Sequence, residues 1–286
     1  MSKIKPLEIG TIAKVYDQTP DVYLGRITDF GLSLCQLGGV ADNLLFGPER
    51  ASRIAALKNE IKARDITVSA VWVPYRGQKG SFSEAPTTLG LVPESTRAER
   101  MIRNCMTSQL AAELDVNLLA AHVGFIPEDN GGDRYKRFVE DMHRFLEYCQ
   151  NQGQSFIFET GQEGVDVLER FLKDLDMPNI GLNFDMANLL IYNFDDPSAL
   201  VDRLGKYIIN THIKDGKRPT RPASFGEEVF VGEGDANVFD LIKRLYREYD
   251  YTGPLVIERE IEGEQQKIDI QKIAAMLENV RKELGL

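Results

Sequence analysis

Short apolar segments alternate along the chain with longer segments in which apolar residues recur every three or four positions. A short run that is rich in β-branched or aromatic residues and ends in polar residues is typical of a buried parallel strand. Eight such runs predict strands at 7–13, 32–39, 66–75, 117–127 with its loop, 155–159, 180–185, 207–213 and 253–260. The longer segments predict helices at 21–30, 49–64, 94–114, 134–151, 164–175, from 196, at 238–249 and at 273–286.

The regular alternation of strand and helix indicates the fold class. Eight strand–helix units, with no linker or internal repeat between them, favour a single α/β domain that spans residues 1–286. A doubly wound dinucleotide-binding sheet is the alternative, but no GxGxxG follows the first predicted strand. We therefore predict a (β/α)8 TIM barrel, whose site lies where the carboxyl ends of its strands converge.

The last four predicted strands each end in a side chain that can bind a metal ion. These side chains are Glu159, Asp185, His212 and Glu258. Three carboxylates and one imidazole form a hard donor set, which suits Mn²⁺, Mg²⁺ or Co²⁺ and is compatible with Zn²⁺. The sequence predicts one divalent ion here, with Mn²⁺ expected first. Glu260 shares the strand face of Glu258, because side chains alternate with period two, and is the alternative ligand.

Each ligand also has a simpler interpretation. Asp185 could cap the helix or turn that begins in DMAN, and His212 could be a hydrogen-bonded strand histidine. Glu159 lies within an aromatic run, where a carboxylate without a partner is costly, so a ligand is the better interpretation there. The occurrence of all four at consecutive strand ends favours a metal site over these alternatives.

Five further side chains near strand ends are expected to bind substrate: Trp72, His122, Glu163, Asn188 and Lys214. Trp72 could equally pack in the core, and His122 could be a structural histidine bonded to a loop carbonyl. Lys214 shares strand parity with His212, so it either points into the site or pairs with Asp215.

Two segments near these residues lack a clear period and are rich in Gly, Pro, Ser or Thr, or in Lys and Arg. Residues 76–93 and 214–236 are therefore expected to be loops over the barrel mouth that exclude water from the site. A basic group in the second loop, Lys217, Arg218 and Arg221, could hold a phosphate or could simply be solvated.

Composition limits the partners and the compartment. The net charge of −10 argues against nucleic-acid binding, since no basic surplus is present to neutralise phosphates. Cys35, Cys105 and Cys149 are widely spaced, which fits reduced thiols in the cytoplasm. The amino-terminal MSKIKPLEIG enters a strand-like run at once, with no room for the apolar segment of a signal peptide, and no run approaches the length of a membrane span. We expect a soluble cytoplasmic protein that acts on a small molecule and assembles as a homo-dimer or homo-tetramer.

Five motifs, FETGQE, FDMANLL, THIKDG, VGEGD and GPLVIERE, are similar to motifs of the xylose isomerase-like superfamily of sugar (phosphate) isomerases and epimerases. The resemblance implies a TIM-type barrel and one divalent ion held by Glu159, Asp185, His212 and Glu258. In related epimerases, the residues that correspond to Glu159 and Glu258 are both ligands and bases. Several of those epimerases have a histidine three residues after the aspartate, where this chain has Asn188, and the difference bears on the substrate.

The combined interpretation is a metal-dependent enzyme. Glu159 and Glu258 would exchange a proton with a ketose or keto-sugar through a metal-stabilised enediolate, which makes the protein an isomerase or epimerase of carbohydrate metabolism. A lyase or dehydratase acting on a keto-sugar, inosose or keto-glycoside would use the same site, because an enediolate next to a leaving group eliminates it. A non-catalytic barrel that binds a sugar or polyol is the third possibility.

Overall fold

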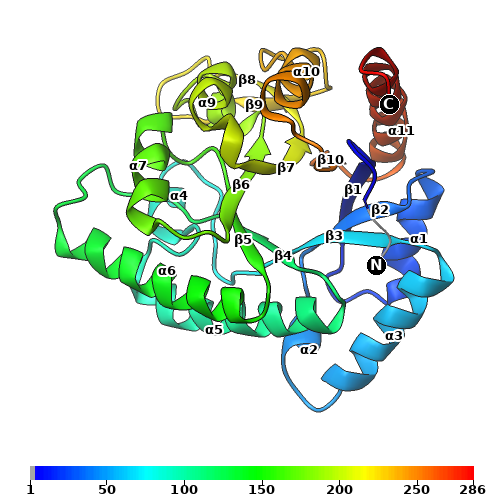
Figure 1. Ribbon diagram of the computed structural model, residues 1–286, viewed down its shortest axis with the longest axis horizontal. Coiled ribbons are helices and arrows are strands. Elements are labelled where there is room, and N and C mark those ends of the chain that lie inside the picture. The colour runs from blue at the N-terminus through cyan, green and yellow to red at the C-terminus, as the bar shows by residue number, and fades with distance from the viewer. Residues whose placement is uncertain (1–3) are drawn as a thin grey trace.

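The computed structural model describes residues 4–286, and its centre is a closed barrel of eight parallel strands (Figure 1). Neighbouring strands follow the order β1-β10-β7-β6-β5-β4-β3-β2. Their bounds are β1 Ile9–Lys14, β2 Leu34–Gly38, β3 Thr67–Trp72, β4 Leu118–Ala121, β5 Ser155–Glu159, β6 Ile180–Asp185, β7 Ile208–Ile213 and β10 Leu255–Ile257. The predicted TIM barrel is confirmed.

Helices follow the strands along the chain and surround the barrel (Figure 1). The long ones are α1 Pro20–Asp29, α3 Arg50–Ala63, α5 Glu94–Glu113, α6 Asp133–Asn151, α7 Val165–Leu175, α9 Pro197–Leu204, α10 Val238–Tyr249 and α11 Glu264–Glu283. A 3₁₀ turn, η1 Gly205–Tyr207, follows α9. Asp196 caps α9 by accepting the Ser198 N–H at 2.7 Å, as the Asp-Pro start of this segment suggests.

Most of the predicted helices and strands are present in the structure, and β5 and β6 also have the predicted bounds. The largest differences are at the carboxyl end of the chain. The last strand ends at Ile257 because Glu258 and the residues after it leave the ladder. The last helix begins at Glu264, nine residues before the prediction. Its first turns lack an apolar period, but Asp269 is buried there and binds the Arg259 guanidinium at 2.8 Å.

The two predicted loops contain regular structure that was not expected. Residues 76–93 include a short helix, α4 Ala85–Thr88. Residues 214–236 include an antiparallel hairpin of β8 Asp215–Lys217 and β9 Glu227–Val229. Two more short helices, α2 Asp42–Leu45 and α8 Asn188–Ile191, were also missed. Elements of three or four residues are too short for a hydrophobic period to reveal them.

The packing around β5 sets the direction of its side chains. Phe156 and Phe158 pack outward: the Phe158 ring lies 5.3 Å from the ring of Phe171 on α7, and the Phe156 ring lies 5.2 Å from that of Phe145 on α6. Because side chains alternate along a strand, Glu159 then points to the inner side of the barrel. The aromatic layer outside the barrel therefore places a carboxylate at its mouth.

No helix in residues 4–286 is both long and apolar enough to cross a membrane. The three cysteines lie within β2, α5 and α6, and none of them forms a disulfide.

A close backbone contact fastens the 76–93 segment to the end of β4. Gly90 has φ +66°, and a Cβ atom on it would overlap the Val123 backbone. The Leu91 N–H donates to the Val123 carbonyl at 2.6 Å. Only a glycine combines this left-handed backbone with this approach.

Replacement of Gly90 by alanine is expected to destabilise the fold by about 2 kcal/mol or more, from left-handed strain and backbone overlap. Thermal unfolding measures this as a fall of several degrees in Tm. Gly80→Ala is the control in the same segment, because Gly80 has no atom within 4 Å of its missing Cβ. Equal Tm values for the two variants would contradict the role of the Gly90 contact.

Candidate metal centre

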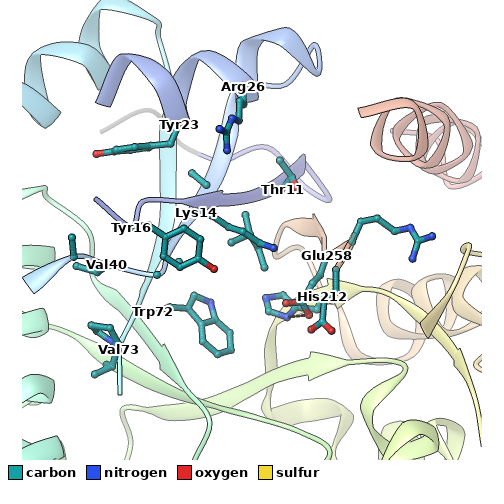
Figure 2. A pocket seen from close by; sticks show the side chains of 18 of the residues that line it. Thr11, Lys14, Tyr16, Tyr23, Arg26, Val40, Trp72, Val73, His212 and Glu258 are labelled. Atoms are coloured by element: carbon teal, nitrogen blue, oxygen red, sulfur yellow. Dashed lines mark ion pairs between the residues drawn. The ribbon is translucent and has the colours of Figure 1, made fainter. Parts of the chain in front are cut away.

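Four side chains meet at the carboxyl ends of the last four barrel strands. Glu159 ends β5, Asp185 ends β6, His212 lies near the end of β7, and Glu258 follows β10. One ligand atom of each lies within 4.8 Å of the others, and all but the partly exposed Glu258 are buried. Figure 2 shows His212 and Glu258 next to each other at the barrel mouth. The structure thus brings together the four residues that the strand ends predicted.

Gln36 on β2 determines which nitrogen of His212 faces the carboxylates. Gln36 Oε1 accepts the Trp72 indole N–H at 2.7 Å and lies 2.9 Å from His212 Nε2. Since an indole nitrogen only donates, the Gln36 atom must be the acceptor, and His212 Nε2 must carry the proton. Nδ1 then faces Glu159 Oε1 at 2.9 Å and Glu258 Oε2 at 3.1 Å. This is the tautomer that a metal ligand requires.

The Asp185 carboxylate has two oxygens with different roles. Oδ1 accepts the backbone N–H groups of Ala187 and Asn188 at 2.9 and 2.8 Å, which is the turn role considered for this residue. Oδ2 is buried and makes no hydrogen bond. Buried polar atoms without partners are rare in folded proteins. Such an oxygen in a cluster of hard donors fits a divalent cation.

The pKa values of the cluster also fit a site for a divalent cation. Burial raises the pKa of Asp185 to about 8; Lys214 opposes this, and the Glu258 and Glu159 carboxylates add to it. Burial opposes the charged form of His212, but the same two carboxylates outweigh it and raise its pKa to about 10. Without a cation, the cluster therefore retains protons where a metal ion would need lone pairs.

Lys214 follows β7 and points into the cluster. It is 3% exposed, and its Nζ lies 2.8 Å from Glu260, 3.3 Å from Glu258 and 3.7 Å from Asp185. Asp215, the alternative partner, accepts backbone N–H groups of residues 216, 232, 234 and 236 instead. Glu260 is 58% exposed and outside the four-residue cluster, so the geometry favours Glu258 over Glu260 as the fourth donor.

The other predicted substrate residues lie around the cluster. His122 follows β4. Its Nε2 lies 2.6 Å from Glu159 Oε2, and its Nδ1 lies 3.1 Å from Gln162 Nε2. Both ring nitrogens therefore face side chains and not a loop carbonyl. Trp72 ends β3, and its ring stacks on His212 with centroids 5.2 Å apart. It therefore supports a donor as well as lining the cavity. Asn188 begins α8 and donates its backbone N–H to Asp185.

Glu163 is a buried carboxylic acid close to the cluster. Its side chain is 2% exposed, and neither of its oxygens makes a hydrogen bond within the described residues. Burial is the main reason why its pKa rises to about 8; His122 opposes the rise and Glu159 adds to it. The group is therefore largely neutral at pH 7.

Sequence reasoning missed an inner layer of amides. Asn183 donates to Glu159 Oε1 at 3.4 Å, and Asn210 donates to Asn183 across the β6–β7 ladder. A signal for them existed: Asn183 and Asn210 stand two residues before Asp185 and His212 and so face the same way. Gln36 is the one polar residue within the apolar run LCQLG. A buried amide in such a run requires a partner.

A cavity of about 750 Å³ opens beside the cluster (Figure 2). His122, Trp72, His212 and Glu258 line its inner end. The rest is lined by residues of β1, α1 and α11, by the segments 38–42 and 73–76, by Gln78 and Arg103, and by residues at the end of β10. A second cavity, of about 590 Å³, lies between the two long loops and is lined mainly by aromatic and proline side chains. Phe82 and Phe225 connect those loops with ring centroids 5.3 Å apart.

The three basic residues of the second loop do not converge on one site in the contacts that follow. Arg218 donates to the side chain of Asn193 at 3.1 Å and to the Asp195 carbonyl at 2.8 Å. Arg221 is exposed and lines the aromatic cavity. The phosphate hypothesis for Lys217, Arg218 and Arg221 stays untested.

Comparison with known proteins identifies the family. The model of the xylose isomerase-like TIM barrel family matches residues 26–280, which is most of the chain. The chain belongs to this family. No curated protein matches it.

Solved structures agree with this membership. A xylose isomerase domain protein from Planctomyces limnophilus is 29% identical, with a TM-score of 0.90 over 98% of this chain and 99% of its own. A D-tagatose 3-epimerase-like protein is 18% identical, with a TM-score of 0.71 over 97% and 99%. A xylose isomerase-like TIM barrel protein from Mycobacterium smegmatis, solved with magnesium, is 16% identical, with a TM-score of 0.70 over 96% of both chains. The latter two likenesses show the fold alone.

Replacement of Glu163 by glutamine tests its neutral state. In the wild type, stability is full below the ordinary glutamate pKa and falls as pH rises toward 8, because ionisation is favoured only in the unfolded chain. The variant has no carboxyl group to ionise at this position and so lacks this pH-dependent loss of stability. We therefore expect its Tm to equal the wild-type Tm near pH 5. By pH 9 the free energy of unfolding of the variant should exceed that of the wild type by on the order of a few kcal/mol, and its Tm should be correspondingly higher.

Thermal unfolding of both proteins in chelator, from pH 5 to 9, measures the difference. The other titratable groups are the same in both proteins, so their effects cancel in the difference between the two Tm values. Glu147→Gln is the matched control, because Glu147 is exposed on α6. A Tm difference for Glu163→Gln that does not change with pH would contradict a neutral Glu163.

Proposed function

We propose that this protein is a divalent-metal-dependent isomerase or epimerase that acts on a ketose or keto-sugar. The observation that carries the proposal is the largely buried cluster of Glu159, Asp185, His212 and Glu258, in which Asp185 Oδ2 has no hydrogen-bond partner and His212 Nδ1 faces two carboxylates. Family membership supports the substrate class, because the family is named for its likeness to a sugar isomerase. Structural relatives of under 20% identity include 3-keto-D-glucoside 4-epimerase from E. coli and L-ribulose 3-epimerase.

The four side chains would hold the ion, and their chemistry suits a hard cation. Three carboxylates with one imidazole favour Mn²⁺, with Mg²⁺, Co²⁺ and Zn²⁺ as alternatives. The related Mycobacterium smegmatis structure contains magnesium, which is consistent with this preference. A divalent ion would supply a Lewis acid for the negative charge that develops when a carbon next to a carbonyl loses its proton.

Glu159 and Glu258 are the proposed acid–base pair. They come from β5 and from the end of β10, which two other strands of the barrel separate. Burial disfavours the Glu258 charge, but Lys214 and His212 outweigh it and hold its pKa well below the usual range. Burial also opposes the charge on Glu159, and His122 and His212 lower its pKa. Both carboxylates are therefore ionised at neutral pH and able to accept a proton.

A basic side chain lies next to each of these carboxylates. His122 contacts Glu159 Oε2 and also lines the cavity, so it connects this carboxylate with the space that a substrate would occupy. Lys214 contacts Glu258. Each carboxylate thus has a partner that favours its ionised form, which a base needs if it is to take a proton from the substrate.

A lyase or dehydratase is the second candidate, and Glu163 is the observation that favours it. Elimination of a hydroxyl group from the same carbanion needs an acid that is still protonated near neutral pH. A buried carboxyl with a pKa of about 8 meets this need. A probable 3-DHS dehydratase from Bacillus anthracis has the same fold at 13% identity. Product analysis separates the two candidates, since only elimination forms a lighter product.

Metal analysis is expected to find about one divalent ion per chain after incubation with Mn²⁺ and removal of excess ion. His212→Ala should weaken binding by roughly 10-fold or more, because it removes a donor outright. Glu147→Gln on the surface should leave binding unchanged. A wild-type protein that takes up no Mn²⁺, Co²⁺, Mg²⁺ or Zn²⁺ would overturn the proposal.

Chemistry and metal binding are expected to separate at the two glutamates. Glu159→Gln and Glu258→Gln keep an oxygen donor but remove the base, so metal affinity should fall modestly while turnover falls roughly 10²–10⁴-fold. NMR in D₂O, with ketoses, 3-keto-sugars and inososes as substrates, measures both turnover and deuterium uptake at carbon. Near-normal turnover of both metal-saturated variants, without deuterium uptake, would instead support a hydride shift between carbons.

A further inference from the structure

Lys14 is the last residue of β1 and lies at the inner end of the 750 Å³ cavity. It shares strand parity with Ile12, and both are partly exposed, whereas Ala13, which also lines the cavity, and Val15 are buried. Figure 2 shows the Lys14 side chain between Tyr16 and Glu258, on the cavity side of the barrel mouth. The ammonium group therefore belongs to the space where a substrate of the metal centre would lie.

Lys14 differs from most cations around it because it has no partner. Within residues 4–286 it makes no hydrogen bond or ion pair, whereas Lys214 contacts three carboxylates. Arg76 and Arg103 both bind Asp42, and Arg259 binds Glu228 and Asp269. Arg26 on α1 is the other cavity cation without an ion pair, and it is exposed at the outer end.

Lys14 is a positive charge in a protein whose net charge is −10. A cation that lines a cavity and has no partner among the described residues is suited to a negative group on a ligand.

The backbone after Lys14 is held in place. The Val15 and Tyr16 N–H groups donate to the carbonyls of Gly38 and Gly39, each at 2.8 Å. Tyr16 has φ +41°, which is uncommon for a residue other than glycine. Its ring is 53% exposed, lines the cavity and faces Trp72 across it in Figure 2. Tyr16 and Trp72 thus present aromatic surface on either side of the space beside Lys14.

We propose that Lys14 binds an anionic group of the substrate, so that the substrate is an acidic or phosphorylated keto-sugar. The inference rests on the proposed function, since it places the carbonyl end at the metal centre and the anionic end at Lys14. The aromatic rings of Tyr16 and Trp72 would contact the carbon chain between the two ends. A carboxylate and a phosphate both satisfy the ammonium, and the test below distinguishes them.

Binding of three probes to the Mn²⁺-loaded protein tests the proposal without any need for turnover. The probes are D-fructose, D-fructose 6-phosphate and 5-keto-D-gluconate, measured by calorimetry at low salt. At least one anionic probe is expected to bind about 10-fold or more tightly than D-fructose. The tighter of the two anionic probes identifies the group. No preference for either over D-fructose would overturn the proposal.

Variants assign the preference to Lys14. Lys14→Met should weaken binding of the preferred anionic probe by roughly 10- to 100-fold and change D-fructose binding by less than about 3-fold. Lys14→Arg should retain most of the preference, which also controls for folding. Lys58→Met, on the exposed face of α3, should match the wild type. An unchanged preference in Lys14→Met would overturn the assignment.

The two proposals fail in different ways. If Lys14→Met removes the anionic preference but no keto-sugar is converted by the wild type, the proposed reaction is wrong and the role of Lys14 stands. If neutral keto-sugars are converted with metal and Lys14→Met converts and binds every probe as the wild type does, the reaction stands and the role of Lys14 is wrong.

Discussion

The gathering of three carboxylates and an imidazole, most of them buried, within 4.8 Å of one another is the constraint on which this site depends. Burial disfavours the charged carboxylates, like charges this close add to the cost, and the raised pKa of Asp185 expresses both effects. Lys214 offsets part of the cost through its contacts with Glu258 and Asp185. A divalent cation would offset the rest. The site is therefore organised for positive charge rather than for packing.

The rigid surroundings of the cluster explain how so many polar groups are held in one orientation. Gln36 and Trp72 fix the tautomer of His212 from the far side of the barrel mouth. The ladder partners Asn183 and Asn210 support Glu159 from within the barrel. Metal donors usually depend on such second contacts for their direction and basicity. Here most of those contacts come from neighbouring or facing strands, so the closed sheet itself aligns the donors.

The cavity joins this centre to a part of the molecule that carries a different chemistry. The carboxylates lie at its inner end, while β1 contributes an unpaired ammonium and a constrained tyrosine. A small carbonyl compound would fill only part of about 750 Å³. A ligand that extends from the metal centre to Lys14 would use both the positive charge and the aromatic walls. The shape of the cavity and its charges therefore favour the same kind of substrate.

The sequence alone determined the barrel and the four candidate donors. Strand type and order followed from local apolar runs, and Glu159, Asp185, His212 and Glu258 could be proposed because parallel strands all end at one face. Short helices, the β8–β9 hairpin and the early start of α11 could not be read, since they lack a hydrophobic period or depend on contacts such as that between Arg259 and Asp269. Only the tertiary structure decided that Glu258 rather than Glu260 joins the cluster, that Lys214 turns inward, and that Gln36 orients His212 across 176 positions of sequence. These outcomes depend on which distant side chains the closed barrel brings within hydrogen-bonding distance, and no local pattern in the chain records that.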